Sequence, residues 1–129
     1  MKARHLYARV SIEADIDSLE DSRQATAAVL RALRDRLTPR EAEQAAAQLP
    51  RELKRLWAGG HPALHQPVKL HRRQFLERVR LDAGLRSLSQ AEMVTDAVFA
   101  GLKEQLSEGE ARDIVAQLPR DLKAQWVRA

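Results

Sequence analysis

Apolar side chains recur at spacings of three and four residues along two stretches of the chain, and each stretch includes one threonine. The first set is Thr26, Val29, Leu30, Leu33 and Leu37, and the second is Thr95, Val98, Phe99, Leu102 and Leu106. Such a stripe is typical of a helix with one buried face. The pattern predicts two long helices that open at Ser18 and Ser87. Each threonine hydroxyl is expected to face the core and to bond a carbonyl one turn back.

Shorter helices are predicted around these two. Apolar positions indicate a helix over roughly 3–14 and another over 71–83, the latter stopped by Gly84. The segment Thr38-Pro39-Arg40-Glu41 is a Thr-x-x-Glu capping box, and Ser107-Glu108-Gly109-Glu110 is its counterpart. Both open a helix that closes near an AQLP sequence. A fourth helix follows each AQLP.

The same order of elements occurs twice. AQLPRELKRLW at 47–57 returns as AQLPRDLKAQW at 116–126, and 17 of 40 positions are identical when 18–57 is laid over 87–126. An internal repeat of this length indicates a duplicated structural unit. We therefore predict an all-α fold of two tandem four-helix repeats, packed as a pseudo-twofold helical bundle with one shared core. Repeat 1 covers 1–57, a Gly- and Pro-containing connector 58–69, and repeat 2 covers 70–129.

Each repeated stretch, 47–57 and 116–126, is interpreted as a sharp turn between two helices. The residue before a proline is disfavoured in the α region, so Pro50 and Pro119 end one helix and act as first-turn residues of the next. Trp57 and Trp126 lie one turn after a leucine on the same face. Burial of a tryptophan removes about 150–250 Å² from water, and its loss costs about 3–5 kcal/mol. These four residues are predicted structural anchors, which explains the repetition without any ligand.

Composition supports packed helices and a soluble chain. Hydrophobic residues make up 44% of the 129 residues but aromatic residues only 4%, so the core is expected to be aliphatic. There is no cysteine, which excludes a thiolate nucleophile or a cysteine zinc site. The charged N-terminus lacks a signal-peptide core, and no apolar run approaches the roughly 18 residues that span a bilayer. A cytoplasmic protein without membrane contact is expected.

These residues also resemble a known family. AVLRALRDRLTPREAEQAAAQLPRELKRLW and FLERV…AVFAGLKEQLSEGEARDIVAQLPRDLKAQW are similar to the two copies found in Domain of Unknown Function family 2267. FLERV at 75–79 and the two AQLP corners are the most specific parts, and the resemblance reaches from the first helix to Trp126. It implies a helical fold and a bacterial setting. It implies no reaction, cofactor or catalytic residue.

Candidate chemistry in the sequence is sparse. The histidines of HPALHQPVKLH, with His5 elsewhere, have spacings seen in metal sites, but the stretch holds two prolines and no Asp, Glu or Cys. A solvated linker is the preferred interpretation. No Gly-rich phosphate loop or nucleophile motif is present, and no pair of acids is expected to be buried together in a pocket. We therefore predict no enzyme, no metal and no cofactor.

The basic run KLHRRQFLERVR at 69–80 is the one place where positive charge concentrates. Lys69, Arg72, Arg73 and Arg80 are candidate phosphate contacts for a weak, sequence-nonspecific nucleic-acid binder. Glu77 can pair with neighbouring arginines, however, and surface aromatics for base stacking are lacking. The net charge of +4 is shared evenly along the chain: eleven basic and nine acidic residues fall in 1–60, and the same numbers in 61–129.

By elimination, the first hypothesis is a non-enzymatic protein-interaction or scaffold module. Two helical units could accept a partner helix in their seam, or in an outer groove along the long helices. A protein partner or self-association is expected, and nucleic acid is the alternative.

Overall fold

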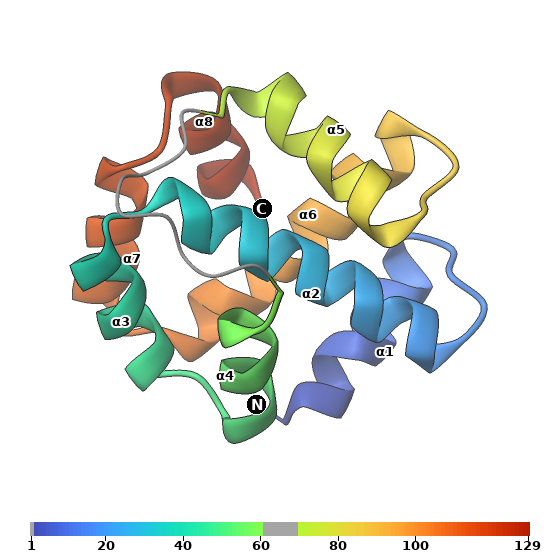
Figure 1. Ribbon diagram of the computed structural model, residues 1–129, viewed down its shortest axis with the longest axis horizontal. Helices are drawn as coiled ribbons and strands as arrows, with labels where there is room; N and C mark the ends of the chain where they lie inside the picture. The colour runs from blue at the N-terminus through green and yellow to red at the C-terminus, as the bar shows by residue number, and fades with distance from the viewer. Residues whose placement is uncertain (1, 61–69) are drawn as a thin grey trace.

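The computed structural model describes residues 2–60 and 70–129, and every regular element within these ranges is an α-helix. The all-α prediction is confirmed. In chain order the helices are α1 (Ala3–Glu13), α2 (Leu19–Arg36), α3 (Pro39–Ala47), α4 (Arg51–Ala58), α5 (Arg72–Ala83), α6 (Leu88–Gln105), α7 (Glu108–Ala116) and α8 (Arg120–Arg128). Figure 1 shows α2 and α6 in the middle of the molecule, with the shorter helices around them. None of the described helices is long and apolar enough to cross a membrane.

The helices begin where the sequence places their caps. The hydroxyls of Ser18 and Ser87 accept hydrogen bonds from the backbone N–H three residues on, and those of Thr38 and Ser107 do the same. Each cap satisfies one of the N–H groups that the first turn leaves without a partner. Gly84 ends α5 with a left-handed φ of +65°. Asp15, 69 positions earlier, has a φ of +55°, so both turns use the same backbone conformation.

Two local expectations need correction. Pro50 and Pro119 are the N-caps of α4 and α8, not residues of the first turn, because their ψ angles of 154° and 159° are extended. Both threonines are buried as expected, but only Thr26 bonds one turn back, with its Oγ1 2.8 Å from the Ser22 carbonyl oxygen. The Thr95 hydroxyl has no hydrogen-bond partner among the described residues. Its place on the buried stripe therefore comes from packing alone.

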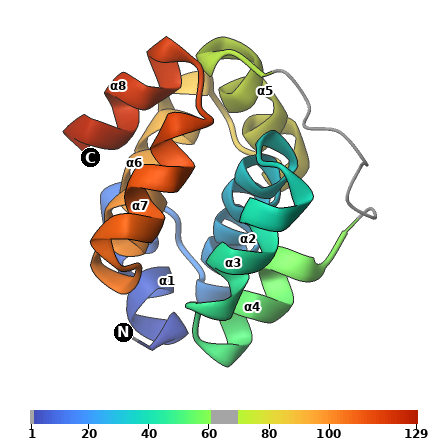
Figure 2. The same cartoon turned by 90° about the vertical axis from the view of Figure 1, so that its left-hand side faces the viewer.

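The two halves of the chain exchange helices in the core. Helix α1 packs against α6, α5 packs against α2, and α3 packs against α7. Figure 2 shows the consequence: α1 lies on the side of α6–α8, whereas α5 lies on the side of α2–α4. One hydrophobic cluster draws buried side chains from all eight helices. Neither half could bury its apolar faces without the other, since each long helix is covered by the other half's first helix.

The ends of the short fourth helices are tied to the long helices. Trp57 and Trp126 are 4% and 3% exposed, and the Trp126 ring lies 4.9 Å from that of Phe99. The Arg34 guanidinium donates to the carbonyl oxygens of Trp57 and Gly59 at 2.7 and 2.6 Å. Lys103 donates to the carbonyl oxygen of Trp126 at 2.8 Å and to that of Ala129. In both halves a cation of the long helix satisfies the open carbonyls at a helix C-terminus, where positive charge is stabilising.

The predicted connector lies mostly outside the described residues. Helix α4 extends one residue into it, to Ala58. His61, His65 and Lys69 belong to 61–69, which the structure does not describe.

Candidate functional site

A hollow of about 450 Å³ opens at the surface where α1, α6 and the end of α8 meet. Its lining residues are Arg9, Glu13, Met93, Asp96, Ala100, Arg128 and Ala129. We call this hollow the α6 groove. Met93 is 45% exposed, one of several large apolar side chains that reach the surface. The groove thus combines an apolar floor with a charged rim.

The rim charges are paired with one another across helices. Arg9 of α1 reaches Glu104 of α6 at 3.1 Å. Arg128 at the end of α8 lies 3.3 Å from Glu92 and 3.5 Å from Asp96. These are exposed ion pairs, each worth less than about 1 kcal/mol. They connect α1 and α8 to α6 at the edge of the groove.

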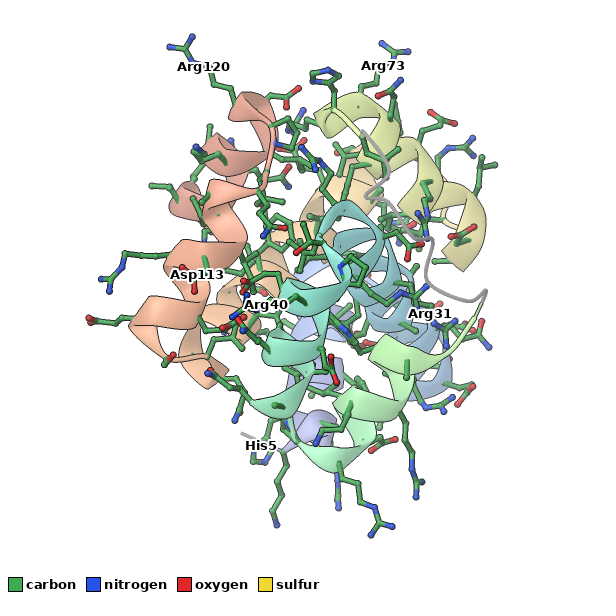
Figure 3. The ribbon with its side chains drawn as sticks, turned by 60° about the vertical axis from the view of Figure 1, so that its left-hand side comes forward. His5, Arg31, Arg40, Arg73, Asp113 and Arg120 are labelled. Carbon is green, nitrogen blue, oxygen red and sulfur yellow. The ribbon has the colours of Figure 1, made fainter. Side chains whose placement is uncertain are left out.

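The corresponding place in the first half is closed by Arg31. The sequence alignment pairs Arg31 of α2 with Ala100 of α6. The Arg31 Nε donates to the Leu56 carbonyl oxygen at 3.0 Å, and its guanidinium lies against Gly59 and Gly60 (Figure 3). A Cβ atom at Gly59 would come within 2.6 Å of the Arg31 Nη2, so a larger residue there would make the end of this side chain move. A long side chain thus lies against the end of α4 in the first half, whereas the aligned Ala100 lines the groove beside the end of α8.

A second feature is a buried pair of carboxylates in the seam between α3 and α7. Glu41 and Glu110 are 8% and 6% exposed, and each lies in the first turn of its helix. Their oxygens and one of Asp113 all lie within 4.8 Å of one another. Figure 2 shows α3 and α7 side by side, and Figure 3 shows Arg40 and Asp113 on either side of this seam. We call Glu41, Glu110 and Asp113 the seam cluster.

The sequence predicted that Glu41 and Glu110 complete capping boxes, and this prediction is wrong. In a capping box the glutamate side chain would accept from the backbone N–H of the N-cap residue. Here the Gln117 Oε1 accepts from the Thr38 N–H at 2.9 Å, and the Gln48 Oε1 accepts from the Ser107 N–H at 2.8 Å. Each glutamine thus caps the helix of the other half. The two glutamates are thereby released and turn into the seam, where they are buried together.

Burial has an electrostatic consequence for Glu110. Loss of solvent raises the pKa of Glu110 to about 7, with further contributions from a hydrogen bond to Glu41 and from the negative charges of Glu41 and Asp113. One oxygen of each glutamate, Oε1, has no hydrogen-bond partner among the described residues. Two carboxyls at this distance are favoured to share one proton near neutral pH.

Two of the residues predicted to bind nucleic acid, Arg72 and Arg80, are engaged in ion pairs. Arg72 lies 2.9 Å from Glu92, and its Nε donates to the Gln125 Oε1. Arg80 pairs with Glu77 of its own helix at 2.6 Å. Arg73 is exposed at the start of α5, at the same end of the molecule as Arg120 in Figure 3. Lys69 lies outside the described residues, so within the described part the run does not form a row of unpaired cations.

The comparison with protein families agrees with the sequence resemblance. A family model described as "Uncharacterized conserved protein (DUF2267)" matches residues 3–125. This match covers nearly the whole chain. The chain belongs to the DUF2267 family. A comparison with curated proteins gives no match.

Membership of DUF2267 carries no activity with it, so any site in this DUF2267 protein has to be argued from its own residues. In the sequence, the only signal for the α6 groove is the Arg31/Ala100 difference between the aligned stretches 18–57 and 87–126. The seam cluster had a weaker signal. Glu41 and Glu110 are identical at equivalent positions, but a capping role explained them equally well.

Proposed function

We propose that this protein is a non-enzymatic helical interaction module that receives the apolar face of a partner helix in the α6 groove. The observation that supports this is the open floor at Met93 and Ala100, in the place that Arg31 fills in the other half. A groove between helices with an apolar floor suits an amphipathic helix, which binds through residues one turn apart. The paired rim charges would orient the partner's polar residues.

The architecture we propose around the groove is two tandem four-helix repeats related by a pseudo-twofold axis. Its support is the correspondence of helix bounds at an offset of 69: α2 and α6 match at both ends, and so do α3 and α7. The exchanged packing of α1 and α5 would make the pair a rigid scaffold. A bacterial, cytoplasmic setting rests on the family resemblance and the lack of cysteine, and is part of the same proposal.

The absence of cysteine allows a site-directed test. Met93→Cys, labelled with a photoreactive maleimide, is expected to crosslink a discrete protein when irradiated in lysate of the source cells. Ala47→Cys, at an exposed alanine of α3, is the matched control and should not crosslink that protein. Ala100→Arg, introduced beside Met93→Cys, should abolish the crosslink because it fills the groove as Arg31 does. A crosslink that persists with Ala100→Arg, or that appears equally at position 47, would refute the groove as the binding site.

The alternative, a weak nucleic-acid binder using 69–80, has less support because Arg72 and Arg80 are engaged in ion pairs. The side of Arg73 and Arg120 is where we would place such contacts. Nuclease treatment before irradiation separates the two proposals: a crosslink to a protein held through nucleic acid would disappear. Binding of a fluorescent single strand that weakens steeply with salt and with Arg73→Glu would favour the alternative.

A further inference from the structure

We propose that the seam cluster of Glu41, Glu110 and Asp113 binds one divalent cation with a preference for oxygen ligands, of the Ca²⁺ class. The site joins α3 of the first half to α7 of the second half. It is separate from the α6 groove and does not depend on the proposed interaction.

The geometry suits one ion. Ca²⁺ binds oxygens at about 2.3–2.6 Å, so two ligand oxygens of one ion lie at most about 5 Å apart. All three carboxylates offer an oxygen within 4.8 Å of the others. The donor set contains no sulfur or imidazole, so a hard cation is favoured over Zn²⁺ or Cu²⁺.

Two of the ligands each present one buried oxygen without a hydrogen bond within the described part of the chain. Glu41 and Glu110 are each more than nine-tenths buried, and the Oε1 of each has no hydrogen bond among the described residues. A buried oxygen without a partner destabilises the folded state, and more so when it is charged. Because Gln117 and Gln48 cap the helices, the backbone N–H groups of Thr38 and Ser107 do not use these oxygens.

Access and charge also fit a cation. Asp113 is exposed, so the cluster opens to solvent on that side, where water could complete the coordination shell. The charged groups acting on Glu110 are Glu41 from α3 and Asp113 from α7, and both are acidic. Arg40, exposed on α3, lies across the seam from Asp113 in Figure 3.

The proposal is tested by calorimetric titration of the full chain with CaCl₂, after removal of metal with a chelator. We expect one ion per chain, and a melting temperature that rises with Ca²⁺ concentration. Glu110→Gln and Glu41→Gln should each weaken binding by at least about tenfold, and Asp113→Asn should weaken it less, because that ligand is already solvated. Glu108→Gln, at an exposed position of the same helix, is the matched control and should bind as the wild type does.

Should a variant of a buried glutamate fail to fold, the titration of the wild type and that of the Asp113→Asn variant still decide the question. No heat and no thermal shift at about 10 mM Ca²⁺, the weak end of protein calcium sites, would overturn the proposal. Equal binding by the Glu108→Gln and Glu110→Gln variants would overturn it too.

Discussion

The buried carboxyl pair makes a specific prediction about stability and pH in the absence of metal. The pKa of Glu110 is raised from 4.5 to about 7 in the folded chain, so the folded state binds a proton more tightly than the unfolded state does. Below pH 4.5 the carboxyl is protonated in both states and pH has no effect through it. As the pH rises from 4.5 through 7, the unfolded state loses this proton first. The folded state must then either retain the proton or accommodate a second buried negative charge. Stability is therefore lost as the pH rises.

The magnitude follows from the size of the shift. A shift from 4.5 to about 7 corresponds to about 3 kcal/mol at 1.36 kcal/mol per pKa unit. That is a large share of the roughly 5–15 kcal/mol that stabilises an ordinary domain. In a chain of this length it corresponds to a fall in Tm of about 10 °C between pH 5 and pH 8. Glu110→Gln should remove this fall, because the amide is neutral at every pH and can still donate to Glu41.

The assay is thermal unfolding followed by circular dichroism at a series of pH values, with EDTA present throughout. The quantity to compare is the difference in Tm between the wild type and Glu110→Gln, because His5, His71 and all other titrating groups are common to both. We expect the variant to be the more stable protein at pH 8 and the difference to vanish near pH 4.5. Glu108→Gln should follow the wild type. A difference that does not change with pH would refute the shared-proton interpretation of the seam.

The remaining predictions concern the fold. Trp57→Ala and Trp126→Ala should each lower the free energy of unfolding by about 3–5 kcal/mol in urea melts, since both rings are buried. Gly84→Ala should cost about 1–2 kcal/mol purely through its left-handed φ of +65°, because an added Cβ would meet nothing within 4 Å. Gln48→Ala and Gln117→Ala should each cost about 1 kcal/mol, because each leaves an N-cap N–H of the other half without its partner.

These three predictions have clear contrary outcomes. An unchanged urea midpoint for either tryptophan variant would show that its ring does not anchor the core. A Gly84→Ala variant as stable as the wild type would mean that the turn after α5 adopts another conformation. If Gln44→Ala, at an exposed position of α3, cost as much as Gln48→Ala, the effect would come from helix propensity and not from the cap.

Much of the secondary structure could be predicted from local signals in the sequence. Helix starts at Ser18, Thr38, Ser87 and Ser107 follow from hydroxyls that reach a backbone N–H three residues away, an interaction within one turn. The apolar stripes of α2 and α6 predict that each helix has one buried face, but not which helix covers that face. The prediction was wrong by one position at Pro50, which is the N-cap of α4 and not a residue of its first turn.

Only the tertiary structure decided which helix covers which stripe. Amphipathic faces have the same pattern whether they are covered by their own half or by the other, so the packing of α1 on α6 and of α5 on α2 is invisible in the sequence. Both candidate sites depend on packing between the halves: the α6 groove on that of α1 against α6, and the seam cluster on that of α3 against α7. The seam cluster exists because Gln117 and Gln48 cross between halves to cap α3 and α7, which leaves Glu41 and Glu110 facing each other. The α6 groove exists because Ala100 occupies the place where Arg31 closes the first half. Local sequence determined the helices, because caps and stripes act within a few turns, whereas the sites arise from contacts between residues far apart in the chain.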